Sequence, residues 1–314
     1  MGYRLSLLGG SKVAALACLL MFCGFAARGA EEGGQSQPSA QPQAAEQQRQ
    51  AEPQRPRPYT GDGVPSIGLF YWLSPAKPKM RTGADIPQGA RADLDFARKE
   101  FQSTPGVVLS LPGGGQHTIR MSYFRTRGQG NTFAANDTTI FGTGFAPGDY
   151  LNTNYTLQNG KLSFEYLSWP FPVNFSGLRV KTFWEVQYTG IKYAIDAPLR
   201  ATQDEDGNYI NNFAEGSHWF LYPAFGVGVE KMISRGFRVE AKASGFALPD
   251  RPRLVDAEAF AAYRAGQYEI QFGAKAFHFR TSPREEQFVT GTLSGAYVGM
   301  RWYQIGRASC RVRV

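Results

Sequence analysis

Apolar and polar positions alternate along much of this chain, and residues 178–188 show the pattern most clearly. One set of alternate positions carries Leu178, Val180, Thr182, Trp184, Val186 and Tyr188. The positions between them carry Arg179, Lys181, Phe183, Glu185 and Gln187. A period of two predicts a β-strand with one apolar and one charged face. In a soluble sandwich the apolar face would cover a core, whereas in a membrane barrel it would contact lipid and the charged face would line the lumen.

The same alternation recurs throughout residues 59–304. It predicts strands at residues 66–73, 90–98, 107–111, 117–126, 150–158, 161–168, 178–188, 219–233, 237–248, 257–264, 268–281 and 288–303. Asn159-Gly160 separates two of these segments, and this dipeptide predicts a tight hairpin turn. Residues 131–149 and 196–217 are polar and are predicted to form surface loops.

Three features favour a membrane barrel over a soluble one. Several predicted strands have about 10 residues or more, as a tilted membrane crossing requires. Short turns alternate loosely with long polar loops, as in outer-membrane barrels. Aromatic residues gather near strand ends, as interfacial girdles would: Tyr71, Trp72, Trp169, Phe171, Trp219, Trp302 and Tyr303. The predicted fold is therefore all-β, a transmembrane antiparallel up-and-down β-barrel of about twelve strands, or ten if residues 90–98 or 257–264 do not span the membrane.

Both ends of the chain differ from this body. Residues 1–29 are predicted to be a cleaved signal peptide, with basic residues before an apolar run and Ala27-Arg28-Gly29 as the cleavage site. Residues 30–58 are rich in Gln, Pro and Ala and are predicted to form a disordered arm. Residues 305–314 resemble a translated sequencing adaptor and are predicted to be a non-native tail.

The end segments also account for most of the charge and all of the cysteine. The formal net charge is +8, but the signal peptide and the tail contain six basic residues and no acidic ones: Arg4, Lys12, Arg28, Arg307, Arg311 and Arg313. The body is therefore only weakly basic, which excludes a nucleic-acid footprint. The three cysteines are Cys18, Cys23 and Cys310, so the exported body is expected to lack disulfides and cysteine metal sites.

The final strand resembles the assembly signal of Gram-negative outer-membrane β-barrel proteins, with a glycine, alternating hydrophobic residues and closing aromatics. The residues that match are Gly295, Val298, Met300, Trp302 and Tyr303. The resemblance implies a protein of the cell outer membrane that is inserted by the barrel-assembly machinery. It also implies a monomer in contact with outer-membrane lipid and lipopolysaccharide.

The charged face of the predicted strands would line the lumen. Its residues include Arg120, Glu165, Arg179, Lys181, Glu185, Arg238, Glu240, Lys242, Glu269, Lys275 and Arg301. The same face is predicted to carry Asp93, Asp95 and Glu230. Such residues can form ion pairs across neighbouring strands in a structural barrel, or they can line a passive pore for small solutes.

Two other functions stay open at this stage. An adhesion or recognition barrel would act through the loops at residues 128–149 and 196–217. An outer-membrane lipid hydrolase would need a His–Ser pair, and the one pairing worth testing is His278 with Ser282. Four residues along a strand span about 13 Å, which is too far for a hydrogen bond. No catalytic residue, metal site or cofactor is therefore predicted.

Overall fold

The computed structural model describes residues 64–304, apart from residues 76–77, 83–93, 96–100, 114–116, 170–177, 200–201, 204–208, 211, 235, 249–250 and 285–286. The predicted signal peptide, arm and tail lie outside the described residues. No helix in the described part is long and apolar enough to span a membrane.

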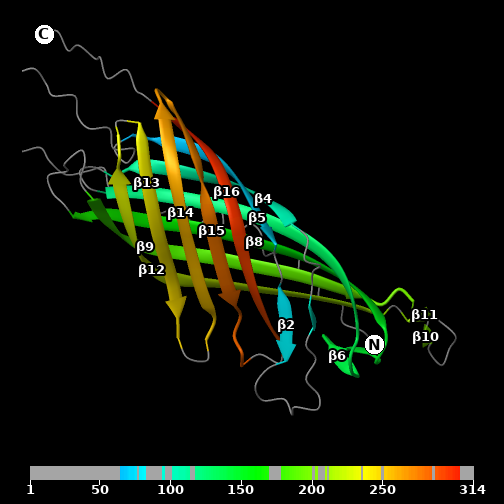
Figure 1. Cartoon of the computed structure of the whole chain (residues 1–314). Helices are drawn as coiled ribbons and strands as arrows, with labels where there is room; N and C mark the ends of the chain where they lie inside the picture. The colour runs from blue at the N-terminus through cyan, green and yellow to red at the C-terminus, as the bar shows by residue number, and fades with distance from the viewer. Residues whose placement is uncertain are drawn as a thin grey trace, which may run out of the picture. The chain divides into compact units, whose positions relative to one another are not determined.

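Ten antiparallel strands form a closed barrel (Figure 1). They are β1 (Ser66–Pro75), β4 (Phe101–Pro112), β5 (His117–Phe133), β8 (Tyr150–Trp169), β9 (Leu178–Asp196), β12 (Phe213–Met232), β13 (Phe237–Ala247), β14 (Arg253–Ala265), β15 (Tyr268–Arg280) and β16 (Gln287–Tyr303). Each strand pairs with the next, and β16 pairs with β1 from Ser66↔Tyr303 to Leu73↔Ala296. The pairing of the first and last strands leaves no open edge in the barrel.

The number of strands agrees with the smaller of the two predicted values. The segment at residues 257–264 does belong to the barrel, within β14, but of residues 90–98 only β3 (Leu94–Asp95) is described. β3 pairs with β2 (Lys79–Thr82), which continues alongside β16 beyond the end of β1. These two short strands lie outside the closed barrel.

The hairpin predicted at Asn159-Gly160 is wrong. β8 runs through both residues and pairs with β5 on one side and β9 on the other. The Asn159 side chain faces inward and donates a hydrogen bond to the Thr189 hydroxyl at 2.9 Å. A full ladder of hydrogen bonds on both edges therefore overrides the local turn preference of this dipeptide.

The connections differ in length at the two ends of the barrel. The first residue of β1, the last residue of β16, the turn after Met232 and the turn between Ala265 and Tyr268 share one end. At the other end, residues 134–149 contain the hairpin of β6 (Thr138–Ile140) and β7 (Thr143–Phe145), and residues 197–212 contain β10 (Thr202–Gln203) and β11 (Tyr209–Ile210). Short turns are typical of the periplasmic side and long loops of the extracellular side.

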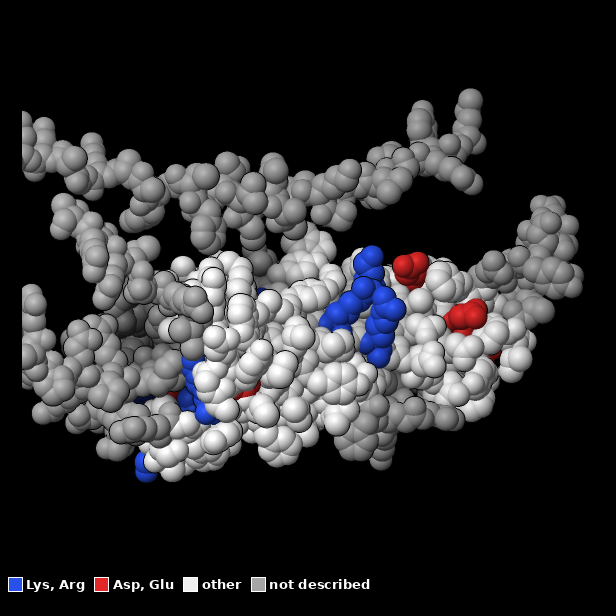
Figure 2. All heavy atoms as spheres, turned by 90° about the horizontal axis from the view of Figure 1, so that it is seen from above, with Lys and Arg blue, Asp and Glu red and all other residues white. Residues whose placement is uncertain are grey.

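The outer face of the barrel wall is apolar. Leu69, Trp184 and Phe272 are each more than 60% exposed. The face drawn in Figure 2 is correspondingly mostly uncharged, with charged side chains confined to a few groups. An exposed apolar surface of this extent would be unfavourable in water, and it matches the lipid-facing band of a membrane barrel.

Four neighbouring strands extend beyond this band. β8 and β12 have 20 residues each and β9 has 19, whereas β13 has 11. A 20-residue strand is about 66 Å long, so even with a tilt of about 40° it exceeds the roughly 25 Å apolar band. Figure 1 shows β5, β8, β9 and β12 running on together towards β6, β10 and β11. We call residues 125–133, 150–160, 190–196 and 213–218 the extramembrane lobe.

Candidate functional site

At the height of the lipid band, charged side chains fill the inside of the barrel. The predicted lumen residues all lie on the inward face: Arg120, Glu165, Arg179, Lys181, Glu185, Arg238, Glu240, Lys242, Glu269, Lys275 and Arg301. Glu230 also faces inward, whereas Asp95 lies in β3 outside the closed barrel and Asp93 lies outside the described residues. Whether these residues line a pore stays a prediction.

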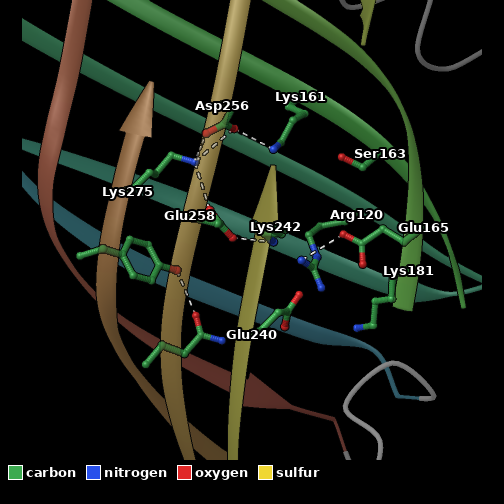
Figure 3. A network of polar contacts seen from close by, with 12 residues as sticks. Arg120, Lys161, Ser163, Glu165, Lys181, Glu240, Lys242, Asp256, Glu258 and Lys275 are labelled. Carbon is green, nitrogen blue, oxygen red and sulfur yellow. Dashed lines mark hydrogen bonds and ion pairs between the residues drawn. The ribbon is translucent and has the colours of Figure 1, made fainter. Parts of the chain in front are cut away.

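Part of this charge network crosses the lumen (Figure 3). The Lys161 ammonium on β8 lies 2.8 Å from the Asp256 carboxylate on β14, four strands away around the barrel. Lys275 on β15 contacts Asp256 at 2.9 Å and Glu258 at 3.1 Å. Glu258 in turn contacts Lys242 at 2.5 Å. Because these pairs join nearly opposite walls, they occupy the lumen instead of leaving it open.

A second cluster of charges lies nearer the end with the short turns. The Arg238 guanidinium contacts the carboxylates of Glu240 at 2.5 Å and Glu269 at 2.8 Å. Glu230 forms ion pairs with Arg179 and, at 2.7 Å, with Lys181. These side chains are nearly all buried, so each charge depends on its partners to offset lost hydration.

Three members of the network are not among the lumen residues predicted from the sequence: Lys161, Asp256 and Glu258. The predicted turn at Asn159-Gly160 puts Lys161 at the start of a strand. The alternation predicted at residues 257–264 begins at Ala257, whereas Asp256, Glu258 and Phe260 share one inward face of β14. Glu258 lies within the predicted segment, and Asp256 lies one residue before it on the same face.

Above the ion pairs, aromatic side chains form a second closed layer. Trp72 on β1 packs edge-on against Phe124 on β5, with ring centroids 5.7 Å apart. Phe124 also meets Phe277 on β15 at 5.4 Å. The Lys275 ammonium lies 5.9 Å from the Trp72 ring and links the two layers.

The two layers close the lumen within the described part of the chain. Trp72 and Phe277 are 0% exposed and Phe124 is 3% exposed. Side chains that line a water-filled channel would contact water, as in porins. The interior at this level is therefore packed.

The orientation of apolar and polar residues reverses in the extramembrane lobe. Within the band, β8 points Leu162 and Phe164 outward and Glu165 inward. In the lobe the same strand points Leu151, Tyr155 and Leu157 inward, where all three are buried, and Asn152, Asn154 and Thr156 outward. This reversal places the outer face of the lobe in water, because it follows the pattern of a soluble sheet.

The β6–β7 hairpin covers the inner face of the lobe. Ile140 and Phe145 are buried, and the Phe141 ring lies 5.2 Å from that of Tyr193 on β9. A Cβ at Gly216 on β12 would overlap the Phe141 ring, so a larger residue there would require this ring to move. The loop predicted at residues 131–149 thus contains an ordered cover.

The structure does not bring the candidate His–Ser pair together. The His278 Nδ1 atom lies 2.8 Å from the Thr292 hydroxyl, and the Ser282 hydroxyl accepts a hydrogen bond from the Arg284 amide. His117 packs against Phe164 and Tyr166. In the described ranges, no group of three or more acidic, His or Cys side chains is arranged to hold a metal ion.

The residues of the predicted assembly signal all lie on β16. Val298, Met300 and Trp302 face outward, whereas the Tyr303 hydroxyl donates a hydrogen bond to Glu269 at 3.0 Å inside the barrel. A Cβ at Gly295 would overlap the Leu73 carbonyl oxygen of β1. Their part in assembly stays a prediction.

Comparison with known proteins finds similarity in fold alone. No family model and no curated protein matches the chain. The outer-membrane protease OmpT from Escherichia coli is 12% identical, with a TM-score of 0.48 over 78% of this chain and 97% of that one. Ail from Yersinia pestis is 11% identical, with a TM-score of 0.33 over 77% and 99%. OprG from Pseudomonas aeruginosa is 10% identical, with a TM-score of 0.34 over 77% and 97%.

Similarity at this level carries no information on activity. The closed antiparallel barrel, its apolar outer band and its charged interior are properties of this chain itself. Together they identify an outer-membrane β-barrel protein.

Proposed function

We propose that this protein is a non-conducting outer-membrane barrel whose extramembrane lobe recognises molecules at the cell surface. The observation that carries the proposal is the packed lumen, closed by the Lys161–Asp256 bridge and by the aromatic layer around Phe124. A barrel that passes no solute and extends well beyond the lipid band must act through the part that extends.

The tip of the lobe offers a surface suited to recognition. Phe133 and Phe213 are 67% and 47% exposed on its outer face, far along the strands from the lipid band. The Phe133 ring lies 5.5 Å from that of Tyr150, whose hydroxyl accepts a hydrogen bond from Asn131 at 2.8 Å. Exposed aromatic side chains with a neighbouring polar group are typical of binding surfaces for proteins and carbohydrates.

Conductance tests the first half of the proposal. The folded full-length protein, inserted into planar lipid bilayers, is expected to give no discrete current steps. Its shift in electrophoretic mobility on heating and its flotation with vesicles would confirm folding and insertion. Discrete steps would overturn the proposal and favour the passive pore.

Surface binding tests the second half. Cells that display the protein should adhere to at least one member of a panel of immobilised glycoproteins and glycans, and cells without it should not. The Phe133→Ala/Phe213→Ala variant should lose that adhesion while it keeps the parent stability, because both side chains are exposed. A matched variant, Leu199→Ala, removes an exposed apolar side chain from the loop beyond β9. Cells that display this variant should adhere as well as cells with the parent protein. Equal adhesion with and without the protein would overturn the proposal.

A further inference from the structure

Three basic side chains stand together on the outer face of the lobe. Arg125 and Arg127 lie on β5 and Lys192 lies on β9, and all three are exposed. The register places Arg127 opposite Thr156 on β8, and Thr156 opposite Lys192. Two strand spacings separate Arg127 from Lys192, about 10 Å, so both long side chains can reach one phosphate group. Among the residues that the structure describes, none of the three forms an ion pair.

The cluster borders an open hollow of about 560 Å³. The outward side chains around this hollow are Arg127, Gln129, Asn154, Thr156, Lys192 and Glu215. Thr156 lies between Arg127 and Lys192, and Ala194 lies in the next row, between Asn154 and Glu215. The short side chains of Thr156 and Ala194 leave space between the longer ones around them. Amide and hydroxyl groups beside two cations match the chemistry of a phosphorylated sugar.

The cluster also lies at the boundary between lipid and water. Two residues along each strand towards the membrane, Gln158 on β8 pairs with Arg125 on β5 and with Gly190 on β9. Trp219 on β12 pairs with Gly190 in the same row of neighbouring residues. In the next row Tyr123 and Tyr188 face outward, and Gln158 joins their hydroxyls at 3.4 and 3.3 Å. Below them the outward residues are apolar, beginning with Met121, Leu162 and Val186. Aromatic side chains of this kind mark the headgroup level, and the long loops identify this boundary as that of the outer leaflet.

We propose that Arg125, Arg127 and Lys192 bind the phosphate groups of a phosphorylated glycolipid of the outer leaflet, the chemistry of lipopolysaccharide. The arginines hold phosphate through paired N–H donors, and Lys192 adds a third positive charge. Asn154, Thr156 and Gln129 contact the sugar hydroxyls. Glu215 lies on the side of the hollow away from the membrane, so its charge favours binding of the anion at the membrane end. This site is separate from the recognition surface at the tip of the lobe.

Native mass spectrometry of the detergent-purified full chain would test the site. The probe is the bisphosphorylated diglucosamine lipid of lipopolysaccharide, and its dephosphorylated form is the control lipid. The Arg125→Gln/Arg127→Gln/Lys192→Gln variant should bind the phosphorylated lipid at least about 10-fold more weakly than the parent, since charge-assisted bonds to phosphate are lost. Both proteins should bind the dephosphorylated lipid equally weakly.

A matched variant separates a built site from general charge attraction. Lys231 is an exposed, outward cation at the opposite end of β12, and Lys231→Gln should leave binding unchanged. Equal binding by the parent and the triple variant would overturn the proposal, as would the same loss in Lys231→Gln. Inorganic phosphate should not displace the lipid at similar concentration, and displacement would indicate a site for free phosphate instead. Heat-shifted mobility of each variant confirms that it is folded.

Discussion

At the residue scale, buried charges inside the barrel depend on one another. Arg238 illustrates this, because it contacts both Glu240 and Glu269 and lies 3.9 Å from Glu230. Its guanidinium also lies 5.4 Å from the Phe260 ring. Loss of Arg238 would leave the carboxylates of Glu240 and Glu269 buried with fewer positive charges to offset their lost hydration.

The Arg238→Ala variant should therefore be strongly destabilised. We expect its free energy of unfolding to fall by about 3–5 kcal/mol, as for other broken buried ion pairs. Urea unfolding in lipid vesicles, followed by tryptophan fluorescence, would measure the change. The free energy of unfolding of Arg238→Lys should lie between those of the parent and of Arg238→Ala, since lysine keeps the charge but loses the paired donors. Lys231→Ala, which removes an exposed cation, should change stability by less than about 0.5 kcal/mol, and an equal effect of both alanine variants would contradict the argument.

At the element scale, pairing with neighbours decides where strands continue. β8 is paired along both edges through Asn159 and Gly160, although this dipeptide strongly favours a turn. A two-residue turn of the usual kind would need a positive φ at Gly160. The glycines with positive φ in the described part are Gly142, Gly148 and Gly266, and Gly160 is not among them.

Alanine substitution distinguishes a strand glycine from a turn glycine. A Cβ at Gly160 would have its nearest neighbour at 4.0 Å, so Gly160→Ala should stabilise the protein by about 0.4–1 kcal/mol by restricting the unfolded chain. At Gly295 the same change meets the β1 backbone and should destabilise by about 1–3 kcal/mol. Unfolding midpoints in urea would show both effects. A destabilised Gly160→Ala variant would be evidence for a turn at this position.

At the scale of the whole molecule, the lobe and the short turns must lie on opposite sides of the membrane. Short turns are typical of the periplasmic side of such barrels, so we expect the lobe, at the opposite end, to lie outside the cell. Both the recognition surface and the glycolipid site depend on this orientation.

Cysteine labelling of intact cells checks the orientation. In a Cys18→Ser/Cys23→Ser/Cys310→Ser background, a membrane-impermeant maleimide should label Leu199→Cys in the exposed loop beyond β9. It should not label Lys231→Cys, which lies near the turn at the other end, until the outer membrane is disrupted. Val227→Cys faces lipid in the middle of the band and should remain unlabelled in both conditions. Labelling of Lys231→Cys in intact cells would show the reverse orientation.

The sequence by itself determined most of the strands, their lipid-facing residues and the charged inward set around Arg179 and Glu240. Those properties follow from a period of two, which is fixed by the local geometry of a strand. Only the tertiary structure decided that the lumen is packed, because Lys161 and Asp256 are 95 residues apart and meet through barrel closure and register. It also decided that β8 is continuous and that Arg125, Arg127 and Lys192 form one cluster. The sequence places these residues on strands, but the pairing partners of those strands determine which side chains come together.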